Sequence, residues 1–187
     1  MEQLELLMND KELPFHNQLC ALVGDTSYSK RAFLAAGSQF DNLVTIARVR
    51  GNRTFYQKYN ETDKSKKGHP TWYGERFSLN EPQTWHEPDS VAETTFTSRR
   101  GNQYFIKIEA WENMLMKGKD GRQMHKHPFR LLRIRSFNAD GKPAFKRDLW
   151  LIVVGKQRPK LELLDIYEAY RQRYDLEHYY DYENKNC

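Results

Sequence analysis

The sequence has few of the features that mark secreted, membrane or nucleotide-binding proteins. It contains two cysteines, Cys20 and Cys187, too far apart to suggest a metal pair, which favours a reduced cytoplasmic protein. The longest apolar run, residues 149–154, falls far short of the ~20 residues that span a bilayer. The acidic start shows no secretory leader, and no GxGxxG or P-loop pattern occurs. We therefore expect a soluble cytoplasmic protein with no membrane partner.

The charge that is present is basic. Among 187 residues the formal net charge is +5, and the isoelectric point is about 9.1. This balance favours an anionic partner, with nucleic acid ahead of a membrane surface. An aromatic content of 13% argues against disorder, because aromatic side chains are usually buried or stacked. The composition thus indicates a folded protein with an anionic ligand.

The first stretch, residues 1–56, has the pattern of an α/β unit. Residues 18–24 form a nearly continuous apolar run, which predicts a strand buried on both faces. N-cap candidates and a short helix follow, with Gly37 as its closing residue. Residues 42–50 are rich in β-branched side chains and predict a second strand. Strand, helix and strand within so short a segment predict a βαβ-like unit.

The middle stretch, residues 57–154, changes to β-rich segments. Runs at 93–98, 103–111, 128–137 and 147–155 are separated by Gly and Asn/Asp turns at 100–102 and 138–141, which predicts antiparallel strands. The last stretch, residues 155–187, predicts a long helix after Pro159, with Leu161, Leu164, Tyr167 and Tyr174 on its apolar side. The order predicts an α/β domain interrupted by an all-β insertion and closed by a C-terminal helix.

One face of this last predicted helix carries candidate functional residues. At ~100° per residue, Tyr170, Arg173 and Glu177 project from one narrow strip. One interpretation is an Arg173–Glu177 ion pair beside a buried tyrosine, which would stabilise the helix by only ~0.2–0.5 kcal/mol. The other is that Glu177 binds a metal ion while the arginine and the phenol hold a phosphate.

Asp25 also allows two interpretations. It follows the first predicted strand and precedes a helix, where an aspartate commonly caps the helix. The carboxyl ends of strands are also where α/β sheets bind ligands, and a nearby helix N-terminus would keep the carboxylate ionised for a divalent cation. For Asp25 and Glu177 to share a site, the middle of the chain must loop out.

Four segments resemble bacterial insertion-sequence transposases of the DDE type. They are GDTSYSKRAFL (24–34), NLVTIARVRGNRTFY (42–56), WLIVVG (150–155) and YRQRYDLEH (170–178). The resemblance is to the branch whose ribonuclease H-like catalytic domain, a mixed sheet, carries a β insertion. Its second catalytic aspartate lies in a GD-x-x-Y context, as Asp25 does. Its catalytic glutamate lies in a Y-x2-R-x3-E-x6-K signature, whose first three places Tyr170, Arg173 and Glu177 fill.

The resemblance implies a DNA-recombining enzyme that uses two Mg²⁺ (or Mn²⁺) ions ~3.5–4 Å apart. Its expected partners are the transposon ends and the target DNA, and another transposase subunit is a further candidate partner. Asp25 and Glu177 would be its catalytic metal ligands. Tyr170, Arg173 and Lys185 would hold phosphates.

The sequence departs from the family pattern at two places. The signature lysine would fall at Asn184, and Lys185 stands one place later. The family's first catalytic aspartate lies on an earlier strand, and no such residue precedes Asp25. We therefore expect a truncated copy that neither nicks nor joins DNA by itself. The alternatives are a catalytically dead fragment that only binds DNA or a transposase, and an unrelated basic α/β protein that binds RNA or an acidic partner.

Further candidates depend on charge and aromaticity. Arg48, Arg50 and Arg53 follow the second strand and either grip DNA phosphates or form a solvated strand end. His125 and His127 would bind zinc only with a third ligand. The four tryptophans favour core packing over base stacking. A basic set in the insertion is either a solvated face or a DNA-facing surface: Lys117, Lys119, Arg122, Lys126, Arg130, Arg133 and Arg135.

Overall fold

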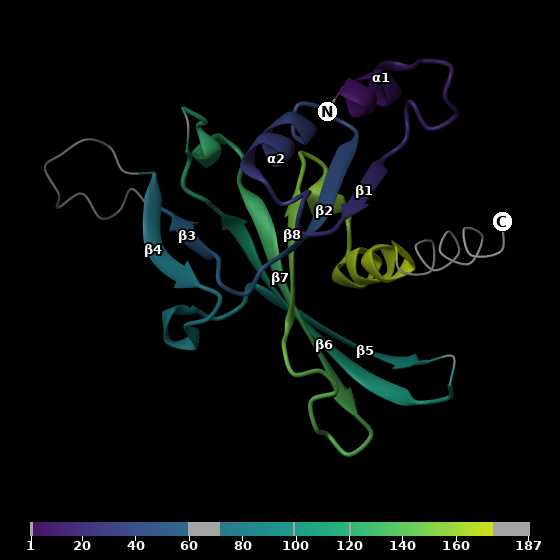
Figure 1. Cartoon of the computed structure of the whole chain (residues 1–187), viewed down its shortest axis with the longest axis vertical. Coiled ribbons are helices and arrows are strands. Elements are labelled where there is room, and N and C mark those ends of the chain that lie inside the picture. The colour runs from purple at the N-terminus through teal and green to yellow at the C-terminus, as the bar shows by residue number, and fades with distance from the viewer. Residues whose placement is uncertain (1, 60–71, 99, 120, 174–187) are drawn as a thin grey trace, which may run out of the picture.

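The structure is a computed structural model, and it describes residues 2–59, 72–98, 100–119 and 121–173. Its centre is a six-stranded mixed sheet with the strand order β1-β2-β8-β7-β6-β5 (Figure 1). The strands are β1 (Cys20–Gly24), β2 (Leu43–Val49), β5 (Ser90–Thr97), β6 (Gln103–Met114), β7 (Phe129–Asn138) and β8 (Leu149–Val154). Among the described strands of this sheet, β1 and β2 run parallel and the other neighbouring pairs are antiparallel.

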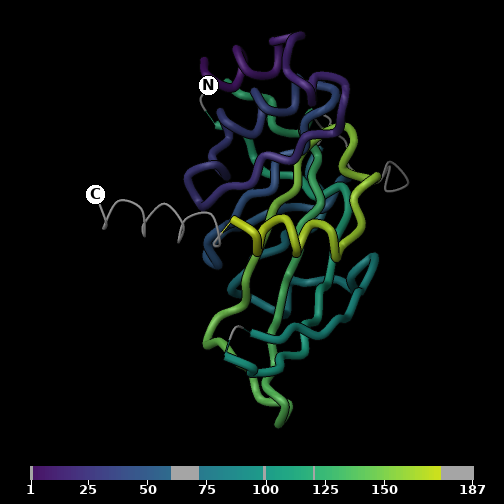
Figure 2. Tube along the Cα trace, turned by 90° about the vertical axis from the view of Figure 1, so that its right-hand side faces the viewer, coloured from purple at the N-terminus to yellow at the C-terminus, as the bar shows by residue number. Residues whose placement is uncertain are grey.

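Smaller elements cover this sheet. The strands β3 (Thr54–Lys58) and β4 (Tyr73–Ser78) form a separate two-stranded sheet. The helices are α1 (Glu2–Asn9), α2 (Arg31–Gly37) and a C-terminal helix described over 163–173, and three short 3-10 helices lie at Pro82–Thr84, Met124–Lys126 and Arg158–Lys160. In the side view, the C-terminal helix crosses over the long strands of the sheet (Figure 2). Among the described residues, no helix combines the length and apolar character that crossing a bilayer requires.

The two faces of the sheet carry two different cores. Alternate residues of one strand point to opposite faces, so Ile152 of β8 joins one core and Val153 joins the other. The first core packs against α2 and the β3–β4 hairpin, and Trp111 and Trp150 are buried in it. The second packs against the C-terminal helix. The helix is therefore fixed to the sheet by burial of its apolar side.

Several sequence predictions are confirmed. The parallel pair β1–β2 with α2 between its strands is the predicted βαβ unit. The β5–β6 pair is antiparallel, and its turn has Gly101 at φ +80°, a left-handed conformation that favours glycine. β7 and β8 are likewise antiparallel, and their connection begins with a turn in which the Gly141 amide donates to the Asn138 carbonyl (2.9 Å). The α/β class with a mixed sheet and a C-terminal helix is thus observed.

Three predictions need correction. β1 lies at the edge of the described sheet with Ala21 exposed, so it is not buried on both faces. Asp25 does not cap α2, because that helix begins at Arg31 after Lys30. The apolar side of the C-terminal helix is predicted only in part: Tyr167 is buried and Leu161 packs against the core as expected, but Leu164 is 39% exposed, and Leu163, Ile166 and Tyr170 are buried instead. Tyr174 lies outside the described residues.

The boundary between core and insertion stays an interpretation. β5, β6 and β7, which belong to the predicted insertion, hydrogen-bond side by side and continue through β8 into the sheet of β1 and β2.

Candidate functional site

Asp25 stands in a tight turn directly after β1. Its carboxylate oxygen Oδ1 accepts a hydrogen bond from the Ser27 amide (2.8 Å), and its carbonyl accepts one from the Tyr28 amide (3.2 Å). The buried Ser29 hydroxyl donates to the Thr26 carbonyl (2.8 Å), which closes the turn from the other side. The backbone of the turn therefore fixes the position of the carboxylate.

The glycine before Asp25 is required by the packing of this turn. A Cβ atom on Gly24 would lie 2.4 Å from the ring of Tyr28, far inside normal contact. The Tyr28 ring also packs edge-on against Phe33 of α2, with the ring centroids 4.8 Å apart. Gly24 and Tyr28 thus hold the Asp25 turn between the end of β1 and α2, which gives the G-D-x-x-Y spacing a structural reason.

The electrostatic surroundings of Asp25 favour its ionised form. The Ser27 amide lowers the pKa of this carboxyl from its ordinary value, partly opposed by desolvation. The positive charges of Arg173 and Lys30 lower the pKa of Asp25 further. Arg173 belongs to the C-terminal helix, so the fold brings that helix within electrostatic reach of the β1 end.

On the C-terminal helix, the described signature residues Tyr170 and Arg173 have different surroundings. Tyr170 is 1% exposed and its ring packs in the core between helix and sheet, so its predicted contact with a phosphate stays a prediction. The guanidinium of Arg173 lies 5.4 Å from the centroid of that ring. Glu177 and Lys185 lie outside the described residues.

Arg48 and Arg50 line a hollow beside Asp25. Both are exposed, and the hollow, with a volume of about 720 Å³, also contains Thr26, the residue after Asp25. Arg147, which sequence reasoning missed, completes its basic wall. The sequence signal was the basic pair Lys146-Arg147 just before β8. Arg53 lies elsewhere, half-buried against the Met116 sulfur, and burial together with the charge of Arg31 lowers its pKa.

The histidine candidates have structural contacts. Nδ1 of His127 hydrogen-bonds the Ser38 hydroxyl (2.6 Å), and His125 stacks on Trp72 with the ring centroids 4.5 Å apart. Trp111 and Trp150 are core residues as predicted, Trp85 packs against that core, and Trp72 is 52% exposed.

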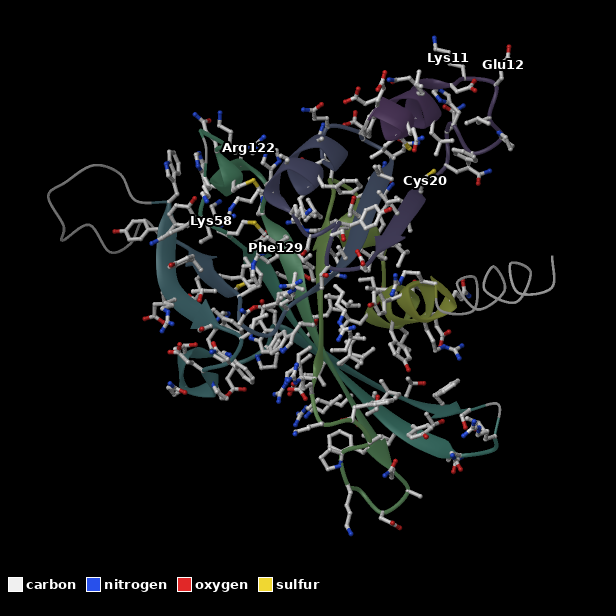
Figure 3. All side chains as sticks on the ribbon, in the orientation of Figure 1. Lys11, Glu12, Cys20, Lys58, Arg122 and Phe129 are labelled. Carbon is white, nitrogen blue, oxygen red and sulfur yellow. The ribbon has the colours of Figure 1, made fainter. Side chains whose placement is uncertain are left out.

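The basic residues of the middle stretch do not form one surface. Arg122 lies beside the β3–β4 hairpin, on the opposite side of the view from the C-terminal helix (Figure 3). Arg130, Arg133 and Arg135 are engaged in ion pairs within the sheet. The predicted DNA-facing surface therefore does not extend evenly over this set.

A divalent cation fits Asp25 as a single ligand. The carboxylate is half-buried and its lowered pKa keeps it ionised, and Mg²⁺ is commonly bound through one or two carboxylates together with water and substrate phosphate. Within the described residues no three His, Cys, Asp or Glu side chains gather closely enough to form a complete metal site. A second protein ligand must come from elsewhere, and Glu177 is the sequence candidate.

Comparison with known families agrees with this geometry. The sequence model of the DDE superfamily endonuclease family matches residues 10–116, more than half of the chain and including Asp25 and both parallel strands. The chain belongs to the DDE superfamily endonucleases. Membership implies DNA as the substrate and a divalent metal such as Mg²⁺ as the usual cofactor. No significant match was found among curated proteins or solved structures.

Proposed function

We propose that this DDE domain serves DNA transposition, cutting and rejoining phosphodiesters at a metal site to which Asp25 and Glu177 each contribute a carboxylate. The observation that carries the proposal is geometric: the turn after β1 fixes the Asp25 carboxylate beside a hollow lined by Arg48 and Arg50. Arg173 acts on Asp25 across the fold, and Glu177 follows Arg173 by about one helical turn. We infer that Glu177, four residues after Arg173 in the sequence, supplies its carboxylate from the same face of this helix.

The bound metal would polarise the phosphate and activate the attacking water or hydroxyl. The residues of this chain bind and orient. Asp25 offers a carboxylate fixed by the Ser27 amide, and Arg173 adds a positive charge beside it. Arg48 and Arg50 line the adjacent hollow, where they would hold the DNA phosphates on either side of the cut. Lys185 and Tyr170 remain proposed phosphate contacts from the family signature.

A site for two metals needs a further carboxylate. Two cations at close range repel each other, and carboxylate oxygens shared between them reduce this repulsion. β1 is an edge strand of the described sheet, so one more strand could pair with it and place an acidic residue beside Asp25. We infer that full activity depends on such a residue.

The proposal is tested first by metal binding. We expect electron paramagnetic resonance to detect Mn²⁺ bound to the purified chain, with binding weakened by Asp25→Asn and by Glu177→Gln. The matched control is Asp140→Asn, which removes the same charge from an exposed turn. Mn²⁺ affinity that is unchanged by Asp25→Asn would refute the metal site.

A plasmid assay separates catalysis from binding. A second candidate is a DNA-binding protein without catalysis, because no strand with an aspartate precedes β1 among the described residues. Supercoiled plasmid is incubated with the chain and Mn²⁺ beside the two carboxylate variants. Nicking that both variants abolish would support catalysis by this chain. Duplex binding without nicking would support the binding protein.

A further inference from the structure

A second, larger groove lies between the C-terminal helix and the far end of the sheet. Its volume is about 1060 Å³, and we call it the aromatic groove after Phe96, Tyr104 and Phe145 in its walls. It shares Arg48, Arg147 and Asp148 with the hollow beside Asp25. The two depressions are therefore adjoining parts of one path that begins next to Asp25.

The cations of this groove fall into two groups. Arg133 is bound to Asp148 (2.6 Å), and Arg171 to Glu168 (2.6 Å), so both are compensated. Arg48, Lys146 and Arg147 are exposed, and no carboxylate of the described residues lies within ion-pair distance of them. The uncompensated positive charge is thus concentrated where the groove meets the hollow beside Asp25, a place that favours an anionic ligand.

The floor and walls of the groove are apolar. Ile106, Ile134 and Tyr170, each at most 3% exposed, form its deep part. The rings of Phe96 and Tyr104 stack with their centroids 6.3 Å apart, and the Arg171 guanidinium lies 4.5 Å from the centroid of the Phe96 ring.

Phe145 occupies a special place in the wall. Its side chain is 66% exposed, on the connection between β7 and β8. A large aromatic side chain in this position gains little from burial and offers its ring to a ligand.

We propose that the aromatic groove binds an unpaired nucleic-acid strand, with phosphates on Arg48, Lys146 and Arg147 and bases against Phe145 and Tyr104. A cationic track beside aromatic faces is the combination that binds single strands, because every base has a face that stacks. A duplex keeps its bases stacked inside and presents phosphates to most of the surface it meets. An acidic peptide would use the cations but has no need of the exposed ring.

The proposal deepens the proposed function, since it names the strand next to the scissile phosphate as unpaired DNA. It is tested without metal, so that failure of the Asp25 site does not affect the result. Fluorescence anisotropy with EDTA present compares a short oligothymidylate with a hairpin duplex of equal length. Phe145→Ala should weaken binding of the single strand by at least about fivefold and of the duplex by less than about twofold.

Two variants and one second measurement sharpen the test. Phe145→Tyr keeps the ring and should restore binding, and Leu6→Ala removes an equally exposed apolar side chain from α1 as the control. Photo-crosslinking with 5-iodouracil in the oligonucleotide should label Phe145 or Tyr104.

Three results would overturn the proposal. They are single-strand affinity that Phe145→Ala leaves unchanged, an equal loss for the duplex, and competition by a poly-glutamate peptide as effective as that by the oligonucleotide. The last would assign the groove to an acidic protein segment.

Discussion

Two sets of arginines in this molecule differ in whether a nearby carboxylate neutralises their positive charge. The paired arginines, Arg130, Arg133 and Arg135, lie on β7, and each has a carboxylate from a neighbouring strand or loop within ion-pair distance. The open arginines are Arg48, Arg50 and Arg147, and all three are exposed. Arg48 and Arg50 lie at the C-terminal end of β2, and Arg147 lies in the β7–β8 connection. No carboxylate of the described residues pairs with the open set.

The difference shows that the positive charge available to DNA is set by the location of the acids. Glu109 lies within ion-pair distance of Lys107 (3.7 Å), Arg133 (3.3 Å) and Arg135 (3.1 Å), so three cations share one carboxylate. These side chains are half-buried within the sheet and serve its packing. The open arginines surround the hollow next to Thr26 and Asp25. The net charge of the chain therefore overstates the positive charge that any one surface presents to DNA, and it does not tell where that surface lies.

The largest expected effect separates the two sets by DNA binding. Replacing the open arginines together by glutamine (Arg48→Gln, Arg50→Gln, Arg147→Gln) should weaken duplex binding roughly 10²–10³-fold at ~0.1 M salt, because each contact releases counterions. The slope of log affinity against log salt should fall by up to about 2.7. The measurement is anisotropy over a salt series.

The control for this experiment replaces exposed lysines elsewhere, Lys11→Gln, Lys58→Gln and Lys160→Gln. Equal losses in the two triple variants would mean that DNA binding is spread over the whole surface. In that case the hollow beside Asp25 would have no special part.

A smaller effect, on stability alone, is expected from the paired set. The Arg130 side chain is 11% exposed, pairs with Glu112 and donates to the Leu161 carbonyl (2.7 Å) just before the C-terminal helix. Arg130→Met should lower the free energy of unfolding by about 2–3 kcal/mol, because it leaves a carboxylate and a carbonyl without their donor. Urea denaturation measures this change, and the salt slope of DNA binding should not move.

The double variant Arg130→Met/Glu112→Gln checks the cause. If the ion pair is responsible, the double variant should be less destabilised than the sum of the two single variants. Strict additivity, or a fall in DNA affinity for Arg130→Met, would remove Arg130 from the paired set.

Sequence reasoning succeeded where the signal is local. The β1–α2–β2 unit, the turns at Gly101 and Gly141, and the position of Asp25 after a strand all follow from neighbouring residues. It failed where segments that are distant in the sequence determine the environment of a residue. That β1 is an edge strand depends on which strands join the sheet, and the compensation of Arg133 depends on the register that sets it opposite Glu109.

The C-terminal helix shows the same limit. The sequence predicted its apolar side with Leu164 inward, but the start of the helix at residue 163 turns Leu163 and Ile166 inward instead. A shift of one residue rotates a helical face by ~100°. Spacing alone could not tell whether Tyr170 packs in the core or contacts a ligand, because either role places it on the same side of the helix.

The smallest expected effect concerns Arg173, which belongs to neither set because its charge acts on Asp25. Arg173→Met should raise the pKa of Asp25, yet leave it below the ordinary value, because the Ser27 amide still stabilises the carboxylate. A lowered pKa in the folded state means that Asp25 stabilises the fold at neutral pH and that this contribution is lost as the pH falls through that pKa. The variant should therefore lose less stability on acidification.

Carbon-13 NMR of the aspartate carboxyl groups follows this titration directly. Arg171→Met is the matched control, because Arg171 lies on the same helix but pairs with Glu168 and lies over Phe96. If Arg171→Met moves the pKa of Asp25 and Arg173→Met does not, the helical strip faces away from Asp25. Glu177, about one turn further along that strip, would then be directed elsewhere, and the proposed pair of metal ligands would fail with it.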